Sequence, residues 1–232
     1  MTNASKKRNA LLIGNSDGIG LGVTRELLGL GWRITGMSRS ESPLSHRSYE
    51  HVVADVSGRD YTEKLRSALR TAGPFELCVY FVGVGEELDL EHMEREVDIF
   101  NVNLMGMIKT VSEVIPVMYK SGGGHFVGLS SVADELLSAE APSYHASKAG
   151  FSNYLEGLAL ALKPAGVSVS NVRFGFVDTK MAKGDRKPFM MSVERAVRHM
   201  KTVIDKKPIR YTAPPVLIPL VRLRGWMYRL KT

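Results

Sequence analysis

Cysteine is nearly absent from this chain, which has one, Cys78, among 232 residues. A single cysteine cannot form an internal disulfide, so we expect a reducing compartment and a cytoplasmic protein. Cys78 lies in the apolar run 77–82, where a buried filler is a better interpretation than a nucleophile. No apolar run approaches the roughly 18 residues that a membrane-spanning helix needs. The polar first residues, with Lys6, Lys7 and Arg8, do not form a secretory signal.

Metal-ligand spacings and nucleic-acid-binding motifs are also missing. None of the six histidines pairs at the spacing of a metal site, so no metal is expected. The net charge is +7, and the basic residues are concentrated between Lys180 and Lys231. Neither a zinc-finger spacing nor an RNP-like strand accompanies them. We therefore interpret the positive charge as a solvated face and expect no nucleic-acid partner.

Strand-like apolar runs alternate with helix-periodic segments along most of the chain. This pattern is typical of an α/β fold, a doubly wound parallel sheet with helices on both faces. The length favours one domain over residues 1–232. The expected strands cover residues 10–13, 33–37, 51–56, 77–82, 126–129 and 167–174. The expected helices include a long one over residues 97–119 and one from about Tyr144 to Lys163.

The first expected strand runs into a glycine-rich turn that opens a helix. Its residues are Gly14, Asn15, Ser16, Asp17, Gly18, Ile19 and Gly20. Glycine is needed where the turn is tight and the backbone approaches a pyrophosphate closely. The start of the helix adds free N–H groups and the positive end of its dipole. The turn therefore predicts a nucleotide site.

The end of the second expected strand indicates which dinucleotide binds. An acid there would bind the ribose 2′-hydroxyl of NAD, whereas a cation accepts the 2′-phosphate of NADP. The chain has Ser38-Arg39 at this place and no acid, and Arg39 can bind a phosphate through paired hydrogen bonds. Asp17 argues for NAD, because a carboxylate in the glycine turn repels that phosphate unless Arg39 neutralises it. We predict NADP(H) over NAD(H).

Tyr144 and Lys148 lie one turn apart if this segment is a helix. A cation about 4 Å from a phenol is worth roughly 4 kcal/mol at an effective dielectric of about 20, enough to lower the pKa of the phenol by about three units. The pair would then act as an acid–base catalyst at neutral pH. The spacing alone is weak evidence, since chance often supplies it.

Together with Ser131, thirteen residues before Tyr144, these features resemble the short-chain dehydrogenases/reductases. The resemblance covers residues 8–180 and implies a Rossmann fold that transfers a hydride between a nicotinamide cofactor and a carbonyl or alcohol substrate. It implies Tyr144 as acid and base, Lys148 as the group that lowers its pKa and binds the cofactor ribose, and Ser131 as donor to the substrate oxygen. It also implies that Asn103 holds a water of a proton relay. The cofactor residues that it adds are Asp55, Val56, Phe81, Val82, Gly83, Gly175, Val177 and Thr179.

The chain departs from the family pattern after the fourth expected strand. Tyr80-Phe81-Val82-Gly83 replaces the usual Asn-Asn-Ala-Gly, which removes a polar support for the cofactor ribose and the central strand. The family's common C-terminal end is absent as well, and the resemblance implies a homodimer through the Tyr144 helix. An alternative function is a non-catalytic NADP-binding regulator or scaffold of the same fold, in which residues 80–82 reflect relaxed chemistry.

The last fifty residues complete the expected organisation. Residues 181–213 form a predicted substrate lid whose methionines suit a lipophilic carbonyl compound, although they could equally cover the sheet edge. Residues 214–232 form a basic amphipathic tail with Trp226 and Tyr228 beside cations. The tail suits either peripheral contact with a membrane or packing on its own domain or a dimer partner. The substrate itself does not follow from the sequence.

Overall fold

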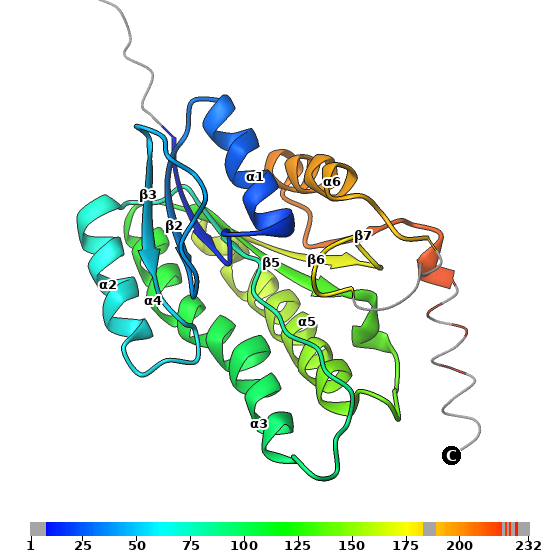
Figure 1. The fold of residues 1–232 in the computed structure, drawn as a ribbon. Helices are drawn as coiled ribbons and strands as arrows, with labels where there is room; N and C mark the ends of the chain where they lie inside the picture. Colours follow the sequence, from blue (N-terminus) through cyan, green and yellow to red (C-terminus); the bar gives the residue numbers. More distant parts are fainter. Residues whose placement is uncertain (1–7, 183–188, 220, 222, 224–225, 227–232) are drawn as a thin grey trace, which may run out of the picture.

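The computed structural model describes residues 8–182 and 189–219, together with Val221, Leu223 and Trp226. The strands are β1 (Asn9–Ile13), β2 (Arg33–Ser38), β3 (Tyr49–Val53), β4 (Leu77–Tyr80), β5 (Gly124–Ser131), β6 (Val167–Phe174) and β7 (Arg210–Ala213). They form one parallel sheet in the order β3-β2-β1-β4-β5-β6-β7 (Figure 1). The order reverses between β1 and β4, and parallel sheets bind nucleotides outside the carboxyl ends of the strands at such a point.

Helices cover both faces of this sheet. The main ones are α1 (Gly18–Gly29), α2 (Tyr61–Ala72), α3 (Glu94–Phe100), α4 (Gly106–Lys120), α5 (Pro142–Leu162) and α6 (Val193–Lys206). The short segments are the π-helical η1 (Asn101–Met105) and the 3₁₀ turns η2 (Val132–Glu135) and η3 (Lys163–Ala165). One core lies between the sheet and α1 and α6, and the other between the sheet and α2, α4 and α5 (Figure 1). The predicted doubly wound Rossmann fold is confirmed.

The central strands are continuous apolar runs because both of their faces are buried. All four residues of β4 are buried, and Cys78 in its middle is fully inaccessible. Burial in this position raises the pKa of the Cys78 thiol well above its usual range, so the thiol stays protonated and unreactive. This agrees with its interpretation as a filler. Each fully buried large apolar side chain, such as Leu11 or Leu12, contributes about 1.5–3 kcal/mol.

Several expected boundaries differ from the structure. The third strand starts and ends earlier than the predicted 51–56, because the chain leaves the sheet after Val53. The long helix predicted over 97–119 starts at Glu94 and passes through the π-helical segment η1. The strand β7 is not among the predicted strands, because it is short and half-exposed and therefore lacks a strong apolar pattern.

The predicted lid, residues 181–213, is largely part of the fold. α6 buries Ala196, Met200, Val203 and Ile204 beside α1, and β7 pairs with β6. Met191 is also buried and bridges to Val177. Among the described residues of this segment, Met181 and Phe189 are large apolar side chains that are exposed, as a lid requires. Residues 183–188 lie outside the described part of the chain.

The first part of the predicted tail packs on its own domain. Leu217 lies against Gly175, where a Cβ would come within 2.4 Å of its Cδ1 atom, and Val221 is buried. Most of residues 220–232, including Tyr228, lie outside the described residues. Among the helices that the structure describes, none combines the length and the apolar character needed to cross a membrane.

Candidate active site

Three loops meet at the carboxyl ends of β1, β4 and β6. A Cβ on Gly14 would lie 2.7 Å from Val82 Cγ2, and one on Gly18 would lie 3.3 Å from Thr179 Cγ2. Both glycines also have positive φ, +83° and +51°, a conformation that favours glycine. The glycine turn therefore packs directly against the loops that follow β4 and β6. The structure brings together the residues that the sequence predicted at this edge.

Asn15 supports the glycine turn from below. Its side chain is fully buried, and Nδ2 donates to Thr24 Oγ1 (3.1 Å) and Tyr49 Oη (3.0 Å). Tyr49 Oη is in turn 2.8 Å from His51 Nδ1. The side chain of Asn15 thus anchors the turn to β3, and only its backbone can meet a cofactor. Sequence reasoning missed this network.

A glycine inside β2 carries the signal of that network. A Cβ on Gly36 would lie 2.4 Å from Asn15 Nδ2 and 2.6 Å from Tyr49 Oη. A glycine in the middle of an otherwise apolar strand indicates a close approach of other groups. Gly36 is therefore the residue of β2 from which the close approach of Asn15 and Tyr49 could be predicted.

Asp17 caps α1 and pairs with a lysine from the loop after β6. Its Oδ1 accepts from Gly18 N (2.7 Å), and Lys180 Nζ lies 2.6 Å from its Oδ2. The hydrogen bond with Lys180, followed by that with Gly18, lowers the pKa of Asp17. The cation beside Asp17 is therefore Lys180, whereas the sequence had suggested Arg39. Asp17 no longer argues against a 2′-phosphate.

The end of β2 places Ser38 and Arg39 beside Asp55. Arg39 is exposed, and its charge is one of the causes that lower the pKa of Asp55, after the hydrogen bond from the Ser57 hydroxyl. Ser57 donates to Asp55 Oδ1 from both its hydroxyl (2.7 Å) and its N–H (2.9 Å). Val56, predicted beside Asp55 at the adenine, is buried, and a Cβ on Gly106 would lie 2.8 Å from its Cγ2. Its side chain belongs to the core.

Tyr80 provides the polar support that the altered segment after β4 had seemed to remove. Its ring is fully buried, and its hydroxyl donates to Val102 O (2.9 Å) in η1. The central strand is thus tied to the helix that carries Asn103. Phe81 is nine-tenths buried in the core under α1 and α6, so of the predicted Phe81–Val82–Gly83 segment only Val82 and Gly83 face the loops of the site.

Strand alternation separates the two serines at the end of β5. Ser130 is buried and contacts Ser152 Oγ (2.8 Å) on α5. Ser131 is partly exposed, accepts a hydrogen bond from Ala133 N (3.1 Å) and interacts with the phenol of Tyr144. The preference for Ser131 over Ser130 agrees with these positions.

Lys148 is an almost fully buried cation one turn after Tyr144. Its Nζ donates to Leu129 O (3.2 Å) and lies 6.0 Å from the centroid of the Tyr144 ring and 5.0 Å from that of Phe151. A Cβ on Gly83 would lie 3.1 Å from Nζ. Burial lowers the pKa of Lys148 to about 8, although the charge of Asp134 opposes this shift.

The pKa of Tyr144 moves in the direction opposite to the prediction. Burial raises it, the hydrogen bond with Ser131 lowers it, and the charge of Asp134 raises it. Burial outweighs the attraction of the Lys148 ammonium, which lies beside the ring at 6.0 Å from its centroid. The Tyr144 phenol is therefore neutral at pH 7 in this structure.

Asn103 is buried, and its side chain links the loop after β4 to α5 through hydrogen bonds. Its Oδ1 accepts from Val84 N (2.7 Å), and its Nδ2 donates to Val84 O (2.9 Å) and Ser147 Oγ (3.0 Å). Both amide hydrogens are used within the protein, so the predicted relay water could bind Asn103 only at an oxygen, and the relay stays a prediction. Ser147 donates to Tyr144 O (2.8 Å), and the tie thereby holds the first turn of α5.

A model of the family described as short chain dehydrogenase matches residues 8–188. The chain belongs to this family. An uncharacterized oxidoreductase of Myxococcus xanthus is 32% identical over 207 residues, which cover 83% of this short-chain dehydrogenase and 82% of the relative. An uncharacterized oxidoreductase of Staphylococcus saprophyticus is 26% identical over 189 residues, 75% and 80% of the two chains. The protein is an oxidoreductase that transfers a hydride between a nicotinamide cofactor and a carbonyl or alcohol group.

Solved structures share its fold. A short chain dehydrogenase of Burkholderia cenocepacia in complex with NADP superposes with a TM-score of 0.86 at 21% identity and 98% coverage of both chains. A short chain dehydrogenase/reductase of Burkholderia phymatum in complex with NAD gives 0.85 at 21% identity, covering 97% of this dehydrogenase and 95% of that chain. Both cofactors thus occur on this fold.

The residues at the carboxyl edge fit a nicotinamide dinucleotide. Gly14 and Gly18 carry no side chain where the loops meet. The N-terminus of α1, with its free N–H groups, lies at the same turn. Lys148 lies beside Gly83 and Tyr144 beside Gly85, where a Cβ would be 3.1 Å from the Tyr144 ring. Gly175, Val177 and Thr179 lie in the loop after β6, where Val177 is buried and Thr179 faces Gly18.

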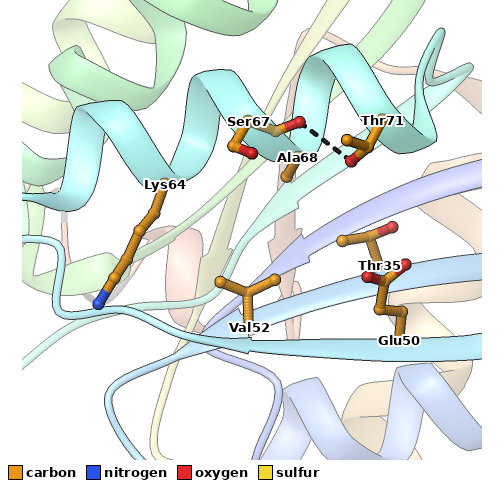
Figure 2. Close-up of a pocket in the computed structure, with 7 residues that line it drawn as sticks. All are labelled: Thr35, Glu50, Val52, Lys64, Ser67, Ala68 and Thr71. Carbon is orange, nitrogen blue, oxygen red and sulfur yellow. Dashed lines mark hydrogen bonds between the residues drawn. The ribbon is translucent and has the colours of Figure 1, made fainter.

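A separate hollow of about 280 Å³ lies between α2 and strands β2 and β3 (Figure 2). It is lined by Thr35, Glu50, Val52, Lys64, Ser67, Ala68 and Thr71. Its polar groups are engaged locally, since Lys64 pairs with Asp60 (2.7 Å) and Thr71 donates to Ser67 O (3.0 Å). None of the predicted site residues lines it, so we assign no function to this hollow.

Proposed function

We propose that this protein is an NADP(H)-dependent carbonyl reductase or alcohol dehydrogenase in which Tyr144 exchanges the proton. The observation that carries the proposal is the position of a neutral Tyr144 phenol between Ser131 and the buried Lys148, beside the loops after β1, β4 and β6. A scaffold that only binds a dinucleotide would need the loops alone. It would not need a phenol and a serine hydroxyl beside the lysine that binds the ribose.

The chemistry divides between the cofactor and the side chains. When bound, the reduced cofactor supplies a hydride to the carbonyl carbon. Tyr144 Oη donates its proton to the carbonyl oxygen, and in the alcohol oxidation it accepts that proton. Ser131 Oγ donates a hydrogen bond to the same oxygen and stabilises the negative charge that develops there. Lys148 stabilises the phenolate that Tyr144 becomes and binds the cofactor ribose, while Asn103 positions α5.

We predict that Tyr144→Phe removes turnover and leaves cofactor binding intact. The substitution deletes the donated proton and keeps the ring that packs on Gly85. Loss of general acid catalysis costs about 10²–10⁴-fold in kcat. The measurement is NADPH oxidation with ketones, aldehydes and steroids, together with NADPH titration.

Tyr119→Phe, at an exposed position near the end of α4, is the matched control and should keep full activity. Turnover by Tyr144→Phe at more than a tenth of the wild-type rate would refute the assignment. Tight NADPH binding by the wild type without turnover of any of these substrates would favour the scaffold.

The preference for NADP(H) is supported by charge at the end of β2. Arg39 is exposed there beside Asp55, the strand-end position holds no acid, and Lys180 neutralises Asp17. A guanidinium can bind the 2′-phosphate through two parallel hydrogen bonds. Met181 and Phe189 are exposed apolar side chains after β6, and Met181 lies near Gly83, which supports a lipophilic carbonyl compound as substrate.

Arg39→Ala should raise the Kd of NADPH about 10–100-fold and leave the Kd of NADH unchanged. A charge-assisted bidentate contact is worth about 1.5–3 kcal/mol, and NADH lacks the phosphate that receives it. Fluorescence titration with both cofactors measures the change. Arg33→Ala, at the opposite end of the same strand, is the control. An equal loss of affinity for both cofactors would contradict the role of Arg39.

We also propose a homodimer through the face formed by α3, η1 and α5. Val97, Met105, Tyr154 and Leu160 are exposed on these elements, with accessible fractions of 60%, 42%, 37% and 67%. Phe151 and Leu155, on the other side of α5, are fully buried in the core and take no part. Sedimentation should give the mass of two chains, and a mass of one chain at micromolar concentration would refute the dimer.

A further inference from the structure

Asp134 and Arg173 form a buried ion pair behind the catalytic residues. Arg173 Nε donates to Asp134 Oδ2 (2.7 Å), and its Nη2 donates to Oδ1 (2.7 Å). Both side chains are only 3% exposed. The geometry is the parallel two-bond arrangement that fixes a guanidinium and a carboxylate in one relative orientation.

The pair joins the elements that carry the catalytic groups. Asp134 lies in η2, three residues after Ser131, and its Oδ2 also accepts from Ser152 Oγ (2.5 Å) on α5. Ser152 contacts Ser130, whose hydroxyl points to Lys148 O at 3.5 Å. Arg173 lies on β6, in register with Ser130. The Ser131 turn, the Lys148 turn of α5 and the neighbouring strand are thus held by one carboxylate.

An outer layer of charge extends the network to the edge strand. Arg173 also contacts Glu135 Oε1 (2.8 Å), and Arg210 on β7 binds Glu156 on α5 through two hydrogen bonds (2.7 and 2.8 Å). Glu156 accepts a further hydrogen bond from Asn171 (2.7 Å). The outer charged groups, Glu135, Glu156 and Arg210, are partly exposed, whereas the Asp134–Arg173 pair is not.

Stability does not account for a pair of this kind. Taking two charges out of water costs about as much as their attraction returns, and apolar residues of similar size often stabilise a fold equally well or better. We propose that Asp134 and Arg173 are positioning residues of the catalytic centre, which fix the Ser131 hydroxyl relative to Tyr144 and Lys148. This inference rests on the proposed function for its effect on turnover.

The charges around the pair are consistent with this role. The ionisable groups that face Asp134 are Tyr144, Lys148 and Glu156 on α5, Glu135 on η2, Arg173 on β6 and Arg210 on β7. The Asp134 carboxylate raises the pKa of Lys148 and that of Tyr144. It thereby favours the two protonated forms with which a carbonyl reduction begins.

The test uses the double variant Asp134→Asn/Arg173→Met in the full chain, which removes both charges and leaves no buried ion unpaired. Arg173→Lys is the second variant, because it keeps the charge and loses the two-bond fork. Glu113→Gln is the matched control, since it breaks another two-bond pair, with Arg66 (2.8 and 2.9 Å), between α2 and α4 far from the site.

Two readouts are measured on each variant. We expect hydrogen exchange of residues 131–135 in the cofactor-free protein to accelerate at least about tenfold in the double variant, with the core strands unchanged. We expect kcat to fall about 10–100-fold in the double variant and less in Arg173→Lys, with the Kd of NADPH within about twofold, because misplacement by about 1 Å can cost that much. Glu113→Gln should change neither readout.

The outcomes separate this inference from the proposed function. Unchanged exchange at residues 131–135, or accelerated exchange with unchanged kcat, would overturn the positioning role. A fall in kcat accompanied by an equal loss of NADPH affinity or by exchange throughout the sheet would show a general structural role and overturn it as well. If the wild type turns over no carbonyl substrate, the proposed function fails, and the exchange measurement alone decides whether the pair fixes the Ser131 turn.

Discussion

A buried ammonium group is the constraint on which the rest of this structure depends. Lys148 is 4% exposed, and among the described residues its ammonium donates a hydrogen bond to one carbonyl, Leu129 O, at 3.2 Å. An isolated charge in such a place is costly, which is why the pKa of Lys148 falls to about 8. A cofactor ribose and a transient phenolate on Tyr144 would supply the partners that the ammonium lacks. The stability of the rest of the fold thus offsets the cost of burying this charge, and the ligands supply its partners.

The surrounding elements are arranged so that this charge stays at one place. Asn103 ties the loop after β4 to the first turn of α5, and Tyr80 ties β4 to η1. Asn15 holds the glycine turn to β3 in the same manner. In each case a buried polar side chain with satisfied donors joins a loop of the site to a rigid element. Preorganisation of this kind lets a site act without reorganising during the reaction.

The sequence predicted what depends on local pattern and order along the chain. The six predicted strands of the parallel sheet, the glycine turn and the spacing of Ser131 before Tyr144 follow from residue type and position. Three features of the site do not follow from local pattern, because each is set by groups distant in sequence. They are the direction in which the Tyr144 pKa shifts, the ion-pair partner of Asp17 and the hydrogen bonds of the Asn103 amide. The edge strand β7 was missed because its half-exposed residues carry little pattern. Asp134 and Arg173 look like ordinary surface charges until the fold buries them together.

The most direct test of this account compares the stability of wild type and Lys148→Met without cofactor. A fall in the pKa of a lysine from 10.5 to about 8 on folding corresponds to about 3 kcal/mol. The unfolded chain holds the proton between these values, so the wild type gains stability as the pH rises from about 8 to 10.5. Lys148→Met should therefore be more stable by about 3 kcal/mol at pH 7, lose this advantage by pH 10.5 and show no turnover, whereas Lys64→Met, at an exposed site, should change stability by less than about 1 kcal/mol. A Lys148→Met protein that is no more stable at pH 7, or that still reduces a substrate of the wild type, would contradict the account.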